Sequence, residues 1–285
     1  PDLNHALVSA GLTNLPIWMN RIATNDAWIR DYGCTFVNGS DQLLAIDWKY
    51  NAWGGKYPPF DLDQHVARRM VDQMPPHVAP EQLGRHVSSI CLEGGAIDIN
   101  SDGVVMSTRS CALNPNRNPG LEVASIEQEL RDCLGATQVL WLSGGGIPGD
   151  DTDGHIDQLA RFVPGDKIVL ASPLNYDEPD SVELARNHSD LKAEIERAGL
   201  GCELIQLPTP ATRDNTGERL PASYCNFYVT NRSVIVPQFG SEQDPVAVEI
   251  LSSLFPAREV KALPSVKLLS GLGSFHCLTQ QQPRV

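Results

Sequence analysis

The sequence predicts one α/β domain spanning residues 1–285, built from strand–strand–helix–strand modules packed around a common axis. Two observations predict this fold. Four segments share one pattern, in which an apolar strand, a tight polar turn and a second apolar strand follow one another. The residues that enter these turns, Val37, Ile99, Val163 and Val229, are 62, 64 and 66 positions apart, which indicates an internal repeat.

The elements of each module follow one another in the same order. The predicted hairpins are residues 35–48, 96–108, 159–172 and 226–239. Helix-like stretches separate them, several with an acidic start and a glycine or proline near the end. These stretches are residues 61–74, 121–135, 180–201 and 244–255. Further strands, such as 137–142 and 202–207, follow the helices, and no linker or low-complexity segment interrupts the series.

The composition is that of a globular protein from a reducing compartment. Hydrophobic residues make up 41% of the chain, which is enough for a substantial core. No stretch approaches the ~18 apolar residues of a membrane span, and the first residues lack the basic start and apolar run of a signal peptide. The seven cysteines include no C-x-x-C pair, so we expect reduced thiols in a cytoplasmic protein.

The net charge of the chain indicates which kinds of partner it can bind. A formal net charge of −13 argues against nucleic acid as a partner and favours a small cationic ligand. No feature of the sequence predicts a membrane partner. The oligomeric state stays open, with a homo-oligomer among the alternatives.

Four chemically unusual residues fall on the same repeat. Asp31, Glu93 and His155 are 62 positions apart, and Cys277 lies 122 positions beyond His155, two repeats on. Each equivalent position lies where a strand leaves the core, just before a hairpin. Quasi-symmetric modules would therefore aim all four side chains at one central cavity.

Each of these residues also has a structural interpretation. Most free cysteines are small buried hydrophobes, and the six cysteines other than Cys277 keep that interpretation. Asp31 follows Arg30, so an ion pair is a fair alternative for it. Function is favoured for Glu93, because buried carboxylates are rare, and for His155, because its acidic neighbours suit a titrating imidazole.

The acidic run "GDDTDGHID" also permits a metal interpretation. Asp153, His155 and Asp157 form a D-x-H-x-D pattern, with which manganese ureohydrolases hold a two-metal centre that activates water against guanidines. That family needs a second aspartate-rich run, which this sequence lacks. A manganese agmatinase-like hydrolase is therefore the second hypothesis, and a site without metal or other cofactor is the first.

A guanidinium group complements the predicted side chains. It is planar and cationic, with N–H donors in a fixed fork, so two carboxylates can bind its edges while a thiolate approaches its central carbon from the face. A Cys-His protease needs one group to orient its histidine, and additional carboxylates would repel its thiolate. The residues thus favour a thiol-dependent reaction on a small cationic guanidine.

Six motifs extend from near residue 25 to the end of the chain: "NDAWIRDYG", "LEGGAIDINSDG", "TRSCALNPNRNP", "GDDTDGHID", "RLPASYCNFY" and "GSFHCLTQQQP". Together they resemble the agmatine deiminases and related bacterial-type peptidylarginine deiminases of the guanidine-modifying pentein superfamily. The resemblance implies a five-bladed α/β propeller, the pentein fold, with ββαβ modules around a pseudo-fivefold axis. By the repeat count one hairpin is missing at the N-terminus, so we expect the fifth module to be incomplete.

The resemblance also implies the activity and the residue roles. The expected reaction is hydrolytic deimination of agmatine to N-carbamoylputrescine and ammonia, a step of putrescine biosynthesis, through a covalent thiouronium and without a cofactor. Carried over residue by residue, Cys277 is the nucleophile and His155 the general acid and base. Glu93 partners His155 and the substrate, and Asp31 and Asp157 bind the guanidinium.

The substrate is less closely specified. We expect Trp28 to line the pocket over the alkyl chain. On the loop 209–227, we expect Asp214 or backbone carbonyls to face the distal amine of agmatine, and Arg219 to have a structural role. The chain has "GLGSFHC" where agmatine deiminases generally have Gly-Gly-Gly-Asn-Ile-His-Cys, and "DYGC" replaces the usual Thr-Gly-Pro after the RD pair. Free arginine and peptidyl-arginine therefore remain alternative substrates, and a non-catalytic guanidine-binding propeller is a third class of function.

Overall fold

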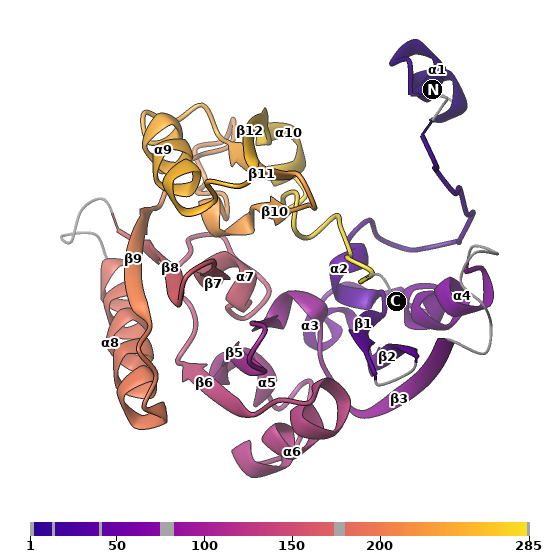
Figure 1. The fold of residues 1–285 in the computed structure, drawn as a ribbon, viewed down its shortest axis with the longest axis horizontal. Coiled ribbons are helices and arrows are strands. Elements are labelled where there is room, and N and C mark those ends of the chain that lie inside the picture. The colour runs from indigo at the N-terminus through magenta and orange to yellow at the C-terminus, as the bar shows by residue number, and fades with distance from the viewer. Residues whose placement is uncertain (1–2, 13–14, 40–41, 75–82, 174–179, 284–285) are drawn as a thin grey trace.

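The computed structural model of the chain describes residues 3–12, 15–39, 42–74, 83–173 and 180–283 (Figure 1). These residues form four three-stranded sheets of identical topology. In each sheet an antiparallel hairpin is followed by a third strand that pairs in parallel with the second strand. Helices lie between the second and third strands. The α/β class and the predicted strand–strand–helix–strand order are therefore confirmed.

The first two modules occupy the N-terminal half of the chain. The first contains α2 (Ile29–Tyr32), β1 (Thr35–Asn38), β2 (Leu43–Lys49), α3 (Ala52–Gly55), η1 (Asp63–His65), α4 (Val66–Asp72) and β3 (Leu83–Cys91). The second contains η3 (Gly94–Ala96), β4 (Ile97–Ile99), β5 (Val104–Thr108), α5 (Arg109–Ala112), α6 (Val123–Leu134) and β6 (Gln138–Leu142).

The other two modules repeat this order. The third contains α7 (Ile156–Leu159), β7 (Ala160–Val163), β8 (Lys167–Ser172), α8 (Asp180–Ala198) and β9 (Glu203–Pro208). The fourth contains η4 (Tyr224–Asn226), β10 (Tyr228–Val229), β11 (Ser233–Gln238), α9 (Asp244–Leu254), β12 (Glu259–Pro264) and α10 (Val266–Leu269).

The helix α6 illustrates why these stretches become helical. Its buried residues Ile126, Leu130 and Cys133 recur at the spacing that places side chains on one helical face. That face packs against the core of the second module. Gly135 ends the helix with a left-handed φ of 67°, which a glycine adopts without steric cost.

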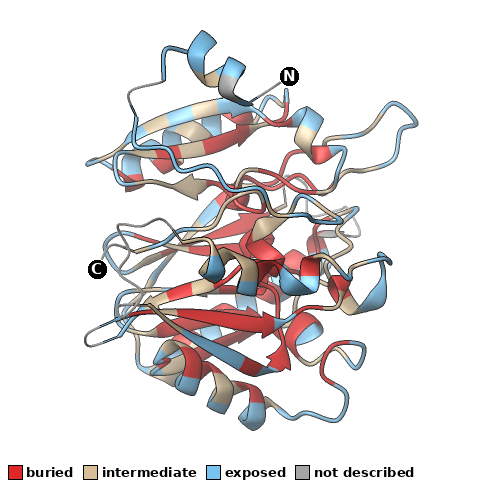
Figure 2. Cartoon of the chain, turned by 90° about the vertical axis from the view of Figure 1, so that its right-hand side faces the viewer, coloured by how far each residue is buried: buried red, intermediate tan, exposed pale blue. Residues whose placement is uncertain are grey.

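The hairpins lie toward the middle of the molecule and the helices α4, α6, α8 and α9 lie on its outside (Figure 1). Buried residues concentrate accordingly in the strands and in the inner faces of the helices (Figure 2). One apolar cluster joins the second, third and fourth modules, and another joins the first and second. None of the helices in the described ranges is both long and apolar enough to span a membrane.

The segment before α2 differs from the modules. It contains the helix α1 (Leu3–Ser9), which lies apart from the sheets in Figure 1, and its described residues form no strand. The side chains of Leu3, Val8 and Trp18 are more than half exposed. The described chain thus has four sheets, and the fifth blade of the propeller stays a prediction.

Candidate active site

Short helical turns precede the four hairpins and carry polar side chains. Asp31 lies in α2, Glu93 and His155 are the N-caps of η3 and α7, and Asn226 ends η4. All four side chains are almost completely buried, with exposed fractions of 3% or less. Three of them are the residues predicted from the repeat. Asn226 is the contribution of the fourth module and is not among the predicted site residues.

His155 lies between two carboxylates. Its Nε2 is 3.5 Å from Oε2 of Glu93, and its Nδ1 is 3.8 Å from Oδ1 of Asp31. Burial by itself lowers the pKa of His155, but the Asp31 carboxylate and the contacts with Cys111 and Glu93 raise it well above its ordinary value. The two neighbouring carboxylates therefore favour the cationic form of the imidazole.

Glu93 is held in turn by Arg117. The Nε of Arg117 lies 2.9 Å from each oxygen of Glu93, and its Nη1 lies 2.6 Å from Oδ2 of Asp153. Burial raises the pKa of Glu93, but His155 and Arg117 outweigh it and lower the pKa to about 2. Glu93 is therefore ionised. Arg117 is not among the predicted site residues, although it lies in the motif "TRSCALNPNRNP".

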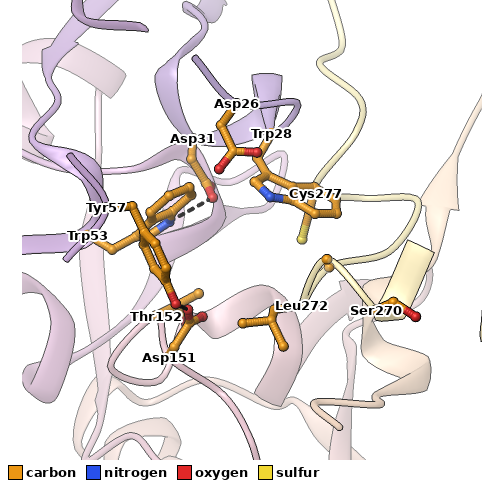
Figure 3. Close-up of a pocket in the computed structure, with 12 residues that line it drawn as sticks. Asp26, Trp28, Asp31, Trp53, Tyr57, Asp151, Thr152, Ser270, Leu272 and Cys277 are labelled. Carbon is orange, nitrogen blue, oxygen red and sulfur yellow. Dashed lines mark hydrogen bonds between the residues drawn. The ribbon is translucent and has the colours of Figure 1, made fainter. Parts of the chain in front are cut away.

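The carboxylate of Asp31 is fixed by two donors. Its Oδ1 accepts a hydrogen bond from the backbone N–H of Gly95 at 3.0 Å. Its Oδ2 accepts one from Nε1 of Trp53 at 3.1 Å (Figure 3). A Cβ atom at position 95 would lie 2.7 Å from both Asp31 Oδ1 and His155 Nδ1. Glycine is therefore required there, because any side chain would separate the carboxylate from the imidazole.

Cys277 lies in a turn after α10 and is 7% exposed. Its Sγ is 3.2 Å from Nδ2 of Asn226 and 3.7 Å from Oδ2 of Asp157. A backbone hydrogen bond of 3.1 Å from Arg30 N to Cys277 O ties this turn to α2. Burial, followed by the Asp157 and Asp31 carboxylates, raises the pKa of the thiol well above its ordinary value.

Asp157 has partners of its own on this side. Its Oδ2 is 2.7 Å from Nδ1 of His276 and 3.2 Å from Nδ2 of Asn226. Burial raises the pKa of Asp157 to about 7. Burial and the nearby cations Arg161 and Arg30 lower the pKa of His276 well below its ordinary value, so this imidazole is neutral.

A cavity of about 240 Å³ opens onto this cluster. Its lining residues are Asp26, Trp28, Asp31, Trp53, Tyr57, Asp151, Thr152, Ser270, Gly271, Leu272, Gly273 and Cys277 (Figure 3). Trp28 lines it as predicted, and its ring packs so closely on Gly273 that a Cβ there would lie 2.5 Å from a ring carbon. Glu93, His155 and Asp157 are not among the residues that line it.

The position of Asp214 differs from the prediction. It is not among the residues that line the cavity. Its Oδ1 accepts hydrogen bonds within its own turn, from Thr216 N and Oγ1 and from Glu218 N. Asp26 and Asp151 are the carboxylates that line the cavity besides Asp31. The expectation for Asp214 is therefore corrected, because its carboxylate stabilises the loop instead.

The residues of the D-x-H-x-D pattern do not gather around one point. Asp153 forms ion pairs with Lys56 and Arg117, whereas Asp157 contacts His276. Within the described ranges, the groups of side chains that could hold a metal ion are Glu93, Cys111 and His155, and separately His86, Glu129 and Cys133. Neither group contains the two aspartates, so the geometry does not support a two-metal centre on this motif.

Comparison with known proteins gives a consistent result. The Porphyromonas-type peptidyl-arginine deiminase family matches residues 3–283. A Legionella pneumophila (strain Paris) protein provisionally named agmatine deiminase is 36% identical over 262 residues, which cover 91% of this chain and 73% of that protein.

Solved structures agree with this match. A cysteine-to-serine variant of C. jejuni agmatine deiminase with substrate bound has a TM-score of 0.83 and 30% identity, covering 97% of this chain and 79% of that one. A Porphyromonas gingivalis protein provisionally named arginine deiminase has a TM-score of 0.88 and 32% identity, covering 100% of this chain and 83% of that one.

Proposed function

Because the chain belongs to the Porphyromonas-type peptidyl-arginine deiminase family, we propose that it is a hydrolase that deiminates agmatine to N-carbamoylputrescine and ammonia. One observation carries this proposal. The cavity brings the thiol of Cys277 together with the carboxylate of Asp31, and the described residues that line it include three aspartates and no lysine or arginine. Such a cavity suits a small ligand with more than one positive charge.

The lining also supports agmatine over arginine. Agmatine has a guanidinium at one end and an ammonium at the other, and the ammonium can face Asp26 or Asp151. Free arginine adds an α-carboxylate, which these aspartates would repel and leave buried without a cationic partner. The relatives named as agmatine deiminases support the same substrate.

The guanidinium is bound between Asp31 and Asp157 in this proposal. Oδ1 of Asp157 is buried and lacks a hydrogen-bond partner in the described structure. A buried acceptor without a partner is costly, and an N–H of the substrate can satisfy it. Trp28 then lies over the alkyl chain, and the sulfur of Cys277 faces the central carbon of the guanidinium.

The reaction proceeds in two stages. The thiolate of Cys277 adds to the guanidinium carbon, the carbon–nitrogen bond breaks, and His155 gives its proton to the departing ammonia. The covalent thiouronium then receives a water molecule whose proton returns to His155. The carbon–sulfur bond breaks, which regenerates the thiolate, and the ureido product is released as its hydroxyl proton passes through solvent to the ammonia, which leaves as ammonium. Glu93 keeps His155 protonated at the start, because its own pKa is low.

The test compares kcat/KM for agmatine, free arginine and an internal peptidyl-arginine after exhaustive chelation. We expect ammonia and a ureido product from agmatine, with free arginine slower by orders of magnitude. A kcat/KM for arginine or the peptide equal to that for agmatine would overturn the proposed substrate and leave the proposed chemistry intact. Metal-dependent release of urea would instead establish the ureohydrolase alternative, and binding without turnover the non-catalytic one.

A further inference from the structure

Asn226 has no role in the reaction proposed above, yet it contacts two of its residues. The side chain is fully buried at the end of η4. Its Nδ2 lies 3.2 Å from Sγ of Cys277 and 3.2 Å from Oδ2 of Asp157. The amide thus lies between the proposed nucleophile and a proposed guanidinium ligand, which are 120 residues apart in the sequence.

The orientation of the amide is fixed by its other partners. Oδ1 accepts the backbone N–H of His276 at 3.1 Å and lies 3.5 Å from the backbone N of Cys277. A backbone N–H can only donate, so the oxygen must face this turn. The NH₂ group is left for the carboxylate and the sulfur, and it has one hydrogen for each of them.

We propose that Asn226 is a further catalytic residue, whose side-chain N–H donates to the sulfur of Cys277 as the thiolate forms and holds the Asp157 carboxylate beside it. This inference rests on the proposed deiminase function for its meaning in catalysis. The hydrogen bonds themselves are a property of the site in the absence of substrate.

The surroundings of the sulfur explain why such a donor is needed. The carboxylates of Asp157 and Asp31 face the thiol and oppose a second negative charge. The cations Arg30 and Arg161 act on the neighbouring His276, which is itself neutral. Within hydrogen-bond distance of Sγ, the described side chains are those of Asn226 and Asp157. Of these two, the amide offers a permanent N–H donor.

The change of protonation at the sulfur needs no movement of the amide. The thiol hydrogen can be donated to Oδ1 of Asn226 at 3.5 Å or to Oδ2 of Asp157 at 3.7 Å. When the proton leaves, the sulfur becomes an acceptor, and Nδ2 of Asn226 is already in place to donate to it. Asn226 keeps its own protons throughout.

The test measures the pH midpoint at which iodoacetamide alkylates Cys277 in the protein without ligand, with the modified residue identified by mass spectrometry. Hydrogen bonds to charged groups are strong enough that Asn226→Ala should reduce the thiolate population at a given pH by about tenfold or more, which raises the midpoint by about one pH unit. The turnover number should fall more than the KM for agmatine changes.

Asn187→Ala is the matched control. Asn187 is also fully buried and also bridges backbone groups, donating to Gly145 O at 3.0 Å and accepting from Gly144 N at 2.9 Å. It should lower the melting temperature without moving the midpoint. Asn226→Leu, which removes the donor but retains volume, decides the matter if Asn226→Ala does not fold.

An unchanged midpoint in a folded Asn226 variant would overturn the proposal, even if turnover fell, because Asn226 would then act only by supporting the fold. That result would leave the deiminase activity standing. The opposite result is also possible. If the parent protein does not hydrolyse agmatine but Asn226→Ala raises the midpoint, the proposed function is wrong and the contact between Asn226 and the thiol stands. The two failures are therefore distinguishable.

Discussion

The two sides of the cavity balance their charges differently. On the His155 side, the imidazolium contacts Asp31 and Glu93, and Arg117 neutralises Glu93 with hydrogen bonds to both oxygens. On the side of Cys277, the sulfur contacts a carboxylate and an amide. On the first side, each of these charged groups therefore has a partner of opposite charge. On the second side, no positive charge of the described residues lies within hydrogen-bond distance of the thiol.

This difference indicates that the substrate supplies the positive charge next to the thiol. A guanidinium between Asp31 and Asp157 would place a cation next to the sulfur of Cys277, and an adjacent cation lowers a thiol pKa. In the proposed mechanism, His155 is therefore prepared as the acid before the substrate binds, and Cys277 is activated by binding. The residue changes below test the two sides separately.

Removal of the nucleophile should have the largest effect. Cys277→Ala and Cys277→Ser should lower kcat by about 10³-fold or more, because the cavity lining offers no comparable nucleophile among the described residues. Binding of agmatine, measured by calorimetry, should survive. Cys202→Ser, at a partly exposed cysteine outside the cavity, is the control and should keep its turnover. Steady-state activity in purified Cys277→Ala would rule out a covalent route.

Changes on the His155 side should come next. Glu93→Gln and Asp31→Asn should each cost a few kcal/mol in kcat/KM, as when a buried ion pair loses one partner. They should differ in stability. Glu93→Gln removes one of the two carboxylates that pair with the buried guanidinium of Arg117, leaving Asp153 alone, and should lower the melting temperature. Asp31→Asn instead retains an oxygen that can accept from Gly95 or Trp53. A kcat/KM equal to that of the parent would remove the role of the residue concerned.

Asp157 gives a stability test with a definite pH dependence. Its pKa of about 7 in the folded protein exceeds the unfolded value of roughly 3.9. Below both values the group is protonated in both states and has no effect. As pH rises, the unfolded chain ionises first, so stability falls until the pH passes the folded pKa.

Asp157→Asn removes this titration. The gain in melting temperature over the parent protein should therefore grow between about pH 4 and pH 8 and reach a few degrees. Calorimetry across this range measures it. A difference that does not vary with pH would show that Asp157 ionises normally in the folded protein, and the contrast between the two sides would weaken.

Ligand-dependent activation of the thiol is a smaller effect. A non-reactive guanidine that leaves the sulfur accessible should increase the alkylation of Cys277 by iodoacetamide about tenfold at fixed pH, because it lowers the raised pKa of the thiol. An ammonium ligand that lacks the guanidine is the control. Equal rates with and without the guanidine would contradict activation by the substrate.

The sequence was informative where the structure is local. Hairpins and amphipathic helices follow from neighbouring residues, so the repeat located the turns that carry Asp31, Glu93 and His155. The quasi-symmetry also predicted that these three side chains lie close together. Contacts made by residues outside this pattern could not be predicted in the same way. Asn226 and Cys277 are 51 residues apart, and their contact depends on how the fourth module meets the C-terminal turn. The fourth place in the repeat could nevertheless have pointed to Asn226, since η4 precedes a hairpin like the other turns.

The expectation for Asp214 failed for a local reason. An aspartate followed two residues later by threonine can satisfy its own carboxylate within a turn, and Asp214 does so with Thr216. Charge in a loop therefore did not indicate charge available to a ligand. Asp26 and Asp151, in the motifs "NDAWIRDYG" and "GDDTDGHID", carry the carboxylates that line the cavity instead.

The smallest effect concerns this outer part of the cavity. Asp151 lines the cavity and accepts a hydrogen bond from the hydroxyl of Tyr57, while Asp214 lies outside the lining. Asp151→Asn should raise the KM for agmatine by the roughly 1 kcal/mol of a partly exposed ion pair, or about fivefold, and leave kcat nearly unchanged. Asp214→Asn should change neither constant. Because a guanidine that lacks the distal ammonium has no charge to place there, its kcat/KM should be the same in Asp151→Asn as in the parent. An equal loss for both ligands would mean that Asp151 acts through the fold of its loop, and a KM effect confined to Asp214→Asn would restore the original assignment.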